Sequence, residues 1–351
     1  MAQKQHADII DVAKAAKVSP ATVSRAFNHP DLVRADTRAK IQRAVDELGY
    51  IRNRAASAMH GEKSGAVGLI VPTIDNAIFS NLIQAFSTAL QDAGQSLLIA
   101  THGYDQTTEH QLLRKLLEHR VDGVGLIGLS HLDRTFDLIE ARETPAVLLW
   151  SFGADARLPC VGSDNFKAGA MAAAHVCDLG HRRVATVFPP LEGNDRAEKR
   201  FSGAQSILGE VPEAWRRTAR YHIGQAREAA RDLLAVVNRP TAILAGNDVI
   251  ARGVISAAAD LDIRVPEDLT VVGIGDFTGS ADLTPALTTV RIDAPRVGQV
   301  AAEALLARMG AKPREAAEIR EIPLELKVRR TSAVPSDAYS PDSKFNCNVI
   351  T

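Results

Sequence analysis

The chain has 351 residues, which is too long for one compact core and predicts two or three domains. Its composition, 46% hydrophobic and 24% charged, is typical of a soluble globular protein, and its apolar runs are far shorter than the ~18 residues that span a bilayer. The net charge of −1 hides an asymmetry, because residues 1–60 carry ten Lys and Arg against six Asp and Glu. A basic first part favours a polyanionic partner for that part alone, with chance scatter of charge as the alternative.

The N-terminal stretch MAQKQHADIIDVAKAA is charged throughout and lacks the apolar core of a secretory signal. Cysteines are few, odd in number and widely spaced, a pattern that fits neither a disulfide framework nor a zinc site (Cys160, Cys177 and Cys347). We therefore expect a cytoplasmic protein with no metal and no cofactor.

Three helices are predicted at the start of the chain. The first covers IIDVAKAA and is followed by a tight turn at Lys17. The second begins after Ser19, which is placed to act as its N-cap, with Pro20 at the first helical position, where a missing N–H costs nothing. The third runs from about Asp36 to Leu48, with its apolar residues on one side. This order predicts a helix-turn-helix with a supporting third helix.

The second helix carries small and hydroxyl side chains on the face opposite its apolar pair, Val23 and Phe27. A core helix would carry leucine or isoleucine there, and a solvated one would carry glutamate and lysine. Small side chains let a helix enter a DNA major groove, where hydroxyls bond phosphates or base edges and an arginine bonds guanine. The predicted DNA-binding residues of this part are Ser19, Pro20, Ala21, Thr22, Ser24, Arg25 and Asn28.

After this part, the short segment from Tyr50 to Gly61 could form one or two helical turns that end at Gly61. A helix this short is marginal in water without packing, so we expect it to form only when something holds it.

From residue 64 to residue 334, short apolar runs alternate with amphipathic helices, which predicts parallel sheets covered on both faces and divided between two α/β lobes. The predicted strands are Ala66–Pro72, Ser96–Ala100, Gly123–Leu129, Ala146–Trp150, Val184–Phe188, Ala242–Ala245 and Thr270–Ile274. The predicted helices include Phe79–Ala93, Thr108–His119, Phe166–Leu179, Arg227–Val237 and Val249–Leu261. Residues 335–351 are polar and aperiodic and are predicted to be a disordered tail.

Several stretches together resemble the lactose/galactose repressor family of bacterial transcription regulators, over about residues 8–334. They are DVAKAAKVSPATVSRAFNHP and TRAKIQRAVDELGYIRNRAA in the first part and VDGV, LGHRRVA, LAGNDVIARG, RVPEDLTVVGI and TPALTTVRID in the remainder. The resemblance implies an all-α helix-turn-helix head (1–50), a hinge helix and linker (51–63), and a two-lobed core similar to periplasmic binding proteins (64–334). The chain is expected to cross between the lobes near 163–165, 291–294 and 319–323.

The same resemblance implies a homodimer on a pseudo-palindromic DNA operator and a small effector between the lobes. In the hinge it implies DNA contacts by Arg52, Asn53, Arg54, Ala56 and Met59. The two arginines are expected to contact phosphate or the hinge region, and Met59 of each chain is expected to act as an apolar wedge in the minor groove.

Open α/β sheets bind ligands at the carboxyl ends of their strands. By that rule and by family position, the candidate effector-binding residues are Ile78, Phe79, Trp150, Arg200, Asn247 and Asp276. Each has a structural alternative: Phe79 as an anchor of its helix, Arg200 as a surface charge and Asn247 as a helix cap. The family often has an aspartate at Gly275, and its loss together with Arg200 favours a sugar acid of the gluconate type over a neutral sugar. The alternative is that Gly275 only permits a special backbone angle.

Catalysis is not indicated by any motif. The literal G-x-G-x-x-G at Gly123–Gly128 lies inside an apolar run, where a chance match is favoured over a dinucleotide site. A solute-binding protein of transport, or an α/β enzyme with an incidental helical head, is the alternative to a regulator. Transport requires export and an enzyme requires a catalytic constellation, so the sequence favours the effector-controlled, DNA-binding regulator, most simply a repressor.

Overall fold

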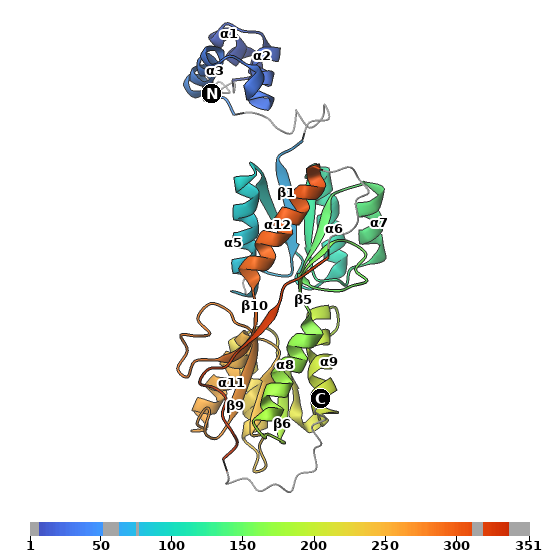
Figure 1. Cartoon of the computed structure of the whole chain (residues 1–351), viewed down its shortest axis with the longest axis vertical. Coiled ribbons are helices and arrows are strands. Elements are labelled where there is room, and N and C mark those ends of the chain that lie inside the picture. The colour runs from blue at the N-terminus through green and yellow to red at the C-terminus, as the bar shows by residue number, and fades with distance from the viewer. Residues whose placement is uncertain (1–6, 52–62, 75–76, 311–318, 337–351) are drawn as a thin grey trace, which may run out of the picture. The chain divides into compact units, whose positions relative to one another are not determined.

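The computed structural model describes residues 7–51, 63–74, 77–310 and 319–336, without the side chains of residues 77 and 78. Between Ser64 and Gly65 the chain divides into two compact units, a small helical head and a large α/β body (Figure 1). Within the described residues, no helix is long and apolar enough to cross a membrane.

The head packs three helices around a small core. Its elements are α1 (Ile9–Ala16), α2 (Pro20–Asn28), the 3₁₀ turn η1 (Pro30–Leu32) and α3 (Ala35–Leu48). The core contains the buried side chains of Val12, Ala13, Ala16, Val23, Ala26, Ile41 and Ala44. The predicted helix-turn-helix with a supporting third helix is therefore present.

Local chemistry explains where these helices begin and end. Asp8 caps α1 in a capping box with Asp11, and Lys17 makes the turn into α2 with a left-handed φ of 56°. At α3, Arg34 occupies the N-cap position without a side-chain hydrogen bond, and Gly49 ends the helix with a φ of 61°. Leu48 was expected on the apolar side of α3, but it is 40% exposed and lies outside the buried core.

The body contains two six-stranded sheets, each at the centre of one lobe (Figure 1). The first sheet has the order β11-β5-β4-β3-β1-β2 and is entirely parallel. The second has the order β12-β10-β9-β8-β6-β7 and is parallel except where β10 pairs with β12. The strands are β1 (Ala66–Val71), β2 (Ser96–Thr101), β3 (Gly123–Ile127), β4 (Ala146–Ser151), β5 (Cys160–Ser163), β6 (Val184–Phe188), β7 (Arg216–Thr218), β8 (Ala242–Ala245), β9 (Thr270–Gly275), β10 (Thr288–Ile292), β11 (Arg320–Glu321) and β12 (Leu324–Lys327).

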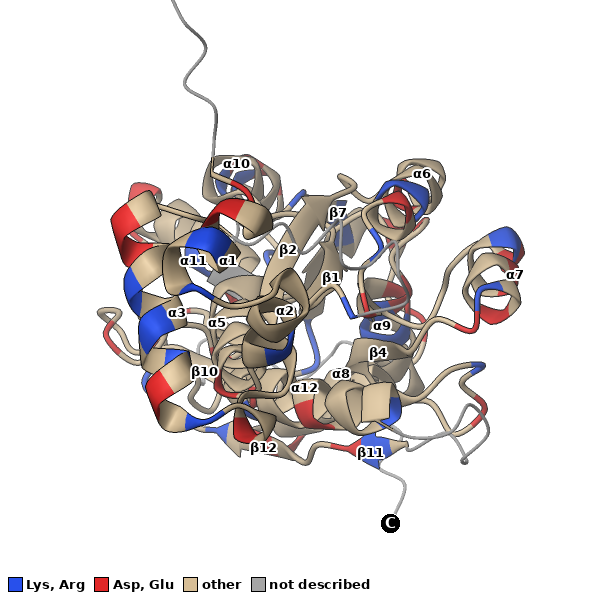
Figure 2. Ribbon diagram, turned by 90° about the horizontal axis from the view of Figure 1, so that it is seen from above, with Lys and Arg blue, Asp and Glu red and all other residues tan. Residues whose placement is uncertain are grey.

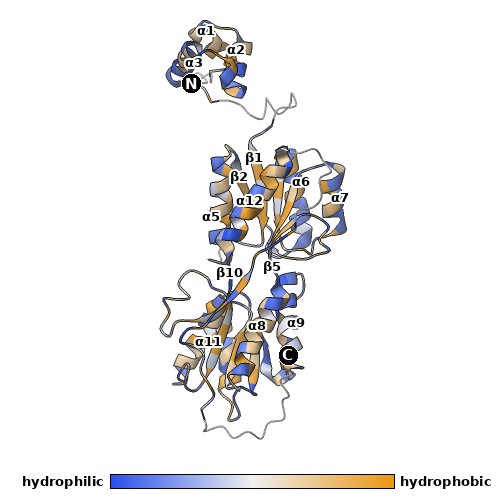
Figure 3. Cartoon of the chain, viewed as in Figure 1, coloured by the Kyte–Doolittle hydropathy of each residue, from blue (hydrophilic) through white to orange (hydrophobic). Residues whose placement is uncertain are grey.

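Helices cover both faces of each sheet and bury the apolar strands between them (Figure 3). In the first lobe α5 and α12 lie on one face and α6 and α7 on the other; in the second, α8 and α9 lie opposite α10 and α11. Their bounds are α5 (Ala77–Asp92), α6 (Gln106–Glu118), α7 (Asp133–Ala141), α8 (Asn165–Asp178), α9 (Asp195–Leu208), α10 (Ile223–Leu234), α11 (Asp248–Asp260) and α12 (Ala294–Gly310), with a 3₁₀ turn η2 (Glu213–Trp215). The predicted class, a helical head followed by two α/β lobes, is confirmed.

The chain passes between the lobes from β5 to α8, from β10 to α12 and from β11 to β12. Cys160 is a buried, free thiol.

Candidate nucleic-acid interface and ligand cleft

Helix α2 is fixed by its own first turn and by two buried side chains. The Ser19 hydroxyl accepts a hydrogen bond from the Thr22 amide at 3.2 Å and lies 2.8 Å from the Thr22 hydroxyl. Val23 and Ala26 face the core of the head. This orientation leaves the small and hydroxyl side chains on the outside, as the sequence predicted.

On the outer face of α2, Ala21 and Arg25 are exposed, and Thr22 and Ser24 are half-buried. Asn28 donates a hydrogen bond to the Ser24 hydroxyl at 3.4 Å. The Arg25 side chain has no hydrogen-bond or ion-pair partner within the described part of the head, so its guanidinium is available to an external acceptor.

Helix α3 carries both signs of charge (Figure 2): Arg38, Lys40 and Arg43 are exposed between Asp36 near its start and Asp46 and Glu47 near its end. Its middle turns therefore offer basic side chains that suit a phosphate backbone, although the helix as a whole has no net charge. The remaining predicted DNA contacts, Arg52, Asn53, Arg54, Ala56 and Met59, lie outside the described residues.

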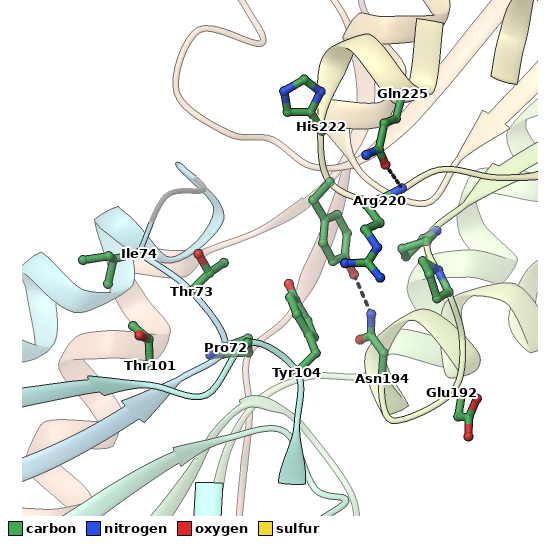
Figure 4. Close-up of a pocket in the computed structure, with 14 residues that line it drawn as sticks. Pro72, Thr73, Ile74, Thr101, Tyr104, Glu192, Asn194, Arg220, His222 and Gln225 are labelled. Carbon is green, nitrogen blue, oxygen red and sulfur yellow. Dashed lines mark hydrogen bonds between the residues drawn. The ribbon is translucent and has the colours of Figure 1, made fainter. Parts of the chain in front are cut away.

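The body has a cavity of about 830 Å³ at the carboxyl ends of strands in both sheets (Figure 4). One wall comes from the loops after β1 and β2, and the other from the loops after β6 and β7 and the start of α10. It is lined by Pro72, Thr73, Ile74, Thr101, Gly103, Tyr104, Pro189, Pro190, Glu192, Asn194, Arg220, Tyr221, His222 and Gln225. This is where open α/β sheets bind ligands, and the volume suits a small molecule.

Two tyrosines meet across this cavity, one from each lobe. The ring centroids of Tyr104 and Tyr221 are 5.7 Å apart with planes tilted by 31°. Asn194 donates a hydrogen bond to the Tyr221 hydroxyl at 2.9 Å, and its other amide atom caps α9. Burial, with Tyr221 as a smaller cause, raises the pKa of Tyr104 above its usual value, so the phenol stays neutral.

The predicted effector-binding residues whose side chains are described do not line the cavity. Phe79 and Trp150 are 2% and 1% exposed and pack edge to face with ring centroids 5.3 Å apart. They anchor α5 to β4, as the structural alternative for Phe79 predicted. The side chain of Ile78 lies outside the described residues.

Arg200 is buried, which excludes its alternative as a surface charge. Its Nε donates to Asn165 Oδ1 at 2.8 Å and its Nη1 donates to the Gly246 carbonyl at 3.0 Å. Desolvation lowers the pKa of Arg200 to about 10, an effect that Tyr221 partly opposes. The guanidinium therefore joins α8, α9 and the loop after β8 just behind the cavity wall.

Asn247 and Asp276 are also engaged within the protein. Asn247 Oδ1 caps α11 by accepting from the Ile250 amide at 3.0 Å, while its buried Nδ2 has no hydrogen-bond partner among the described residues. Asp276 pairs with Arg329 at 2.7 Å. At Gly275, φ is +136° and an added Cβ would lie 2.2 Å from the Phe277 ring. A side chain at this position would be strained and would require Phe277 to move, so the backbone angle alone can account for the glycine, which was the alternative given for it.

A polar contact joins the lobes beside the cavity. Asp195, the first residue of α9, accepts from the Leu129 amide at 2.8 Å, and Arg196 donates to the Ile127 carbonyl at 3.3 Å. The contact is so close at Gly128 that an added Cβ would lie 2.4 Å from the Arg196 guanidinium. Residues 127–129 and 195–196 thus form an interlobe contact one residue away from Asn194 of the cavity.

A buried histidine–carboxylate pair supports the first-lobe side of this contact. His131 Nδ1 lies 2.7 Å from Glu109 Oε1, and His131 Nε2 lies 3.2 Å from the Gly128 carbonyl. This pair fixes the loop that Asp195 and Arg196 contact.

Comparison with known proteins shows to which family the chain belongs. A family model described as bacterial regulatory proteins, lacI family, matches residues 8–53, and one described as a periplasmic binding protein-like domain matches residues 173–332. The transcriptional regulator MalR of Streptomyces coelicolor is 32% identical over 95% of this chain and 99% of its own length. The chain belongs to the LacI family of bacterial transcriptional regulators.

Two solved structures of this family are similar over nearly the whole chain. The lac repressor dimer bound to operator and the anti-inducer ONPF is 25% identical with a TM-score of 0.82, covering 94% of this chain and 100% of its own. A complex of the regulator CelR with cellobiose is 25% identical with a TM-score of 0.67, covering 93% and 100%. The chain is therefore a DNA-binding transcriptional regulator and not an enzyme, as the sequence predicted.

Sequence reasoning missed the residues that line the cavity. Tyr104 follows the predicted strand Ser96–Ala100 in the stretch THGYD, so the strand-end rule could have found it. Arg220, Tyr221 and His222 follow β7, a three-residue strand with the sequence RRT that carries no apolar pattern.

Proposed function

We propose that this LacI-family regulator is a repressor that binds a pseudo-palindromic operator as a homodimer. We also propose that a small effector, a sugar or a sugar acid of the gluconate type, binds in the cavity between the lobes and controls DNA binding. The observation that carries the proposal is the position of the 830 Å³ cavity between the two lobes. A ligand that contacts both lobes stabilises one arrangement of them, and such differential binding can shift an equilibrium.

The DNA-binding part of the proposal rests on α2. Its outer face combines small side chains with Arg25, which is unpartnered within the described head, and these features suit a recognition helix in a major groove. Thr22 and Ser24 already hydrogen-bond to neighbours in their own helix turn, so we assign them phosphate contacts and assign base reading to Arg25.

The homodimer is supported by the edge of the first sheet. Among the described strands, β2 pairs only with β1, and along it Leu98 and Ile99 are 38% and 44% exposed. An open edge with exposed apolar side chains is a ready surface for a second copy.

The sugar part of the proposal rests on the lining of the cavity. Proline and tyrosine side chains offer apolar faces for a sugar ring, and Asn194 and Gln225 offer amides for its hydroxyls. The acid form was argued from Arg200, but two of its nitrogens already bond to Asn165 and Gly246. An acidic effector would instead meet Arg220, which lines the cavity.

The proposal is tested by binding DNA from upstream of the protein's own gene, in excess nonspecific DNA, with and without candidate effectors. Specific binding that a sugar or sugar acid changes is expected. Specific binding that no sugar or sugar acid alters would contradict the effector assignment and leave the DNA-binding assignment standing.

A further inference from the structure

The cluster behind the interlobe contact contains two buried histidines that the proposed function does not use. His102 comes from the loop after β2 and His131 from the loop before α7, and both approach the carboxylate of Glu109 on α6. The side chains of His102, His131 and Glu109 are 7%, 0% and 2% exposed. Histidine changes its charge near physiological pH, so a buried cluster of this kind can respond to a small change in acidity.

The two histidines are held in different ways. His131 uses both ring nitrogens, with Nδ1 at 2.7 Å from Glu109 Oε1 and Nε2 at 3.2 Å from the Gly128 carbonyl. His102 Nε2 lies 3.7 Å from Glu109 Oε2, which is too long for a hydrogen bond. Neither ring nitrogen of His102 has a hydrogen-bond partner of good geometry among the described residues, although buried polar atoms nearly always have one. Hydrogen bonds therefore do not fix the protonation state of His102.

The ring of His102 is surrounded by groups from both lobes. The charged and titratable groups that face it are Glu109, Asp105 and His131 of the first lobe, Arg196 on α9 of the second lobe, and the phenol of Tyr104. Burial lowers the pKa of His102 below its usual value, Glu109 opposes this effect and Arg196 adds to it. A proton on His102 thus brings a positive charge toward the arginine that reaches across from the other lobe.

That arginine belongs to the interlobe contact. Arg196 Nη1 donates to the Ile127 carbonyl at 3.3 Å and pairs with Asp195 at 2.8 Å, while Asp195 also accepts from the Leu129 amide at 2.8 Å. Charges that are buried are screened far less than charges in solvent. Repulsion between protonated His102 and Arg196 therefore acts directly on the residues that join the lobes.

We propose that the interlobe contact is sensitive to acid, with His102 as the group that binds the proton. Neutral His102 leaves Asp195 and Arg196 in contact with residues 127–129, and protonated His102 weakens that contact. Protons are then a second input to the regulator, and this input does not depend on which ligand fills the cavity.

The direction of the pH effect follows from the surroundings of His102. It directly precedes Gly103 of the cavity wall, so parting of the lobes brings water to it and removes Arg196. Its pKa, which is lowered in the closed contact, then returns toward 6.5. The contact is therefore complete above pH ~7 and weakens as the pH falls below about 6.5, by at most about tenfold in its equilibrium constant for each pH unit.

Hydrogen exchange of the full-length protein without ligand or DNA, followed by mass spectrometry between about pH 5.5 and 7.5, tests the proposal. The Leu129 amide donates to Asp195 across the contact, so its protection reports how often the contact opens. After correction for the intrinsic pH dependence of exchange, this protection should be about 3- to 10-fold lower at the acidic end of the range. The amides of the buried strand β4 should show no such change, which separates opening of the contact from loss of the fold.

Replacement of His102 identifies the proton-binding group. His102→Gln should make the protection of Leu129 independent of pH over this range, and His102→Asn is a second neutral replacement in case the first does not fold. His119→Gln is the matched control, because His119 is exposed at the end of α6 in the same lobe, and it should keep the wild-type response. Wild-type protection that stays constant with pH would overturn the proposal whatever the variants do. A response that persists without His102 would also overturn it.

Discussion

Replacing Arg25 with alanine tests the assignment of α2 as the recognition helix. The Arg25 side chain is exposed and has no intramolecular partner in the described head, so the substitution should leave the stability of the head unchanged. The whole effect should therefore appear in DNA binding. A bidentate arginine–guanine contact contributes about 1–3 kcal/mol of discrimination, which is roughly a 5- to 150-fold loss at each half-site.

Fluorescence anisotropy with a specific and a scrambled duplex, each over a range of salt concentrations, measures the two affinities separately. Arg43→Ala is the matched control, because Arg43 is exposed on α3 and bonds only weakly within its own helix, to the Ala39 carbonyl at 3.4 Å. That control should lower specific and nonspecific affinity together, as expected for a phosphate contact. If Arg25→Ala also lowers both equally, the base-reading role of Arg25 is wrong.

Three further predictions concern the body. Gly128→Ala should disrupt the interlobe contact, because the new Cβ would lie 2.4 Å from Arg196 and 2.8 Å from Asp195. Effector affinity measured by calorimetry should change, while DNA binding without effector should persist. An unchanged effector affinity would show that this contact does not influence binding in the cavity. Arg200→Ala should lower the free energy of unfolding by about 2–5 kcal/mol, since it leaves Asn165 and the Gly246 carbonyl buried without their donor. Arg220→Ala should leave denaturant unfolding nearly unchanged, and equal losses in the two variants would contradict the structural role of Arg200. The hydrogen bond from Arg264 lowers the pKa of Asp268 to about 2, so the stability that this pair provides should be complete above pH ~4 and lost as the pH falls toward 2. An NMR titration in which the Asp268 pKa stays low after Arg264→Ala would show that Arg264 is not the group that lowers it.

The fold could be predicted because its determinants are local. Apolar runs of four to seven residues marked the central strands, and β6 and β8 have the predicted bounds. The helix ends in the head follow from the backbone chemistry of single residues: Ser19 and Pro20 begin α2, and Gly49 ends α3. The α5, α6, α8, α10 and α11 helices were predicted to within a few residues of their ends.

Elements that depend on distant partners were not predicted. Strands β5 and β7 are short and mix small or basic residues, and they become strands only because neighbouring strands supply their hydrogen bonds. Helix α12 is rich in alanine and buried along much of its length, and its polar face is narrow, with Arg296, Gln299 and Glu303 exposed. It was not predicted from the sequence.

The effector residues show the same limit. Three of the predicted residues interact within the protein instead of facing the cavity. The Phe79 ring packs on Trp150, Arg200 donates a hydrogen bond to Asn165, and Asn247 accepts one from the Ile250 amide. Residue type and position along the chain cannot distinguish a side chain that faces a cavity from one that packs just behind its wall. The difference between Arg200 and Arg220 is set by the packing of α8 against α9 and by the loop after β7, which are long-range features.

The central claim is that a ligand in the cavity between the lobes controls DNA binding, and one titration tests it most directly. Labelled operator DNA is titrated with the protein in the absence of ligand and again with a candidate effector, a sugar or a sugar acid that the protein is shown to bind, at saturation. Allosteric coupling of ordinary strength predicts that the ligand changes the Kd for operator by about 5- to 150-fold, with nonspecific DNA much less affected. An operator Kd that stays the same at saturating ligand would contradict the claim, because a ligand with equal affinity for both states shifts nothing.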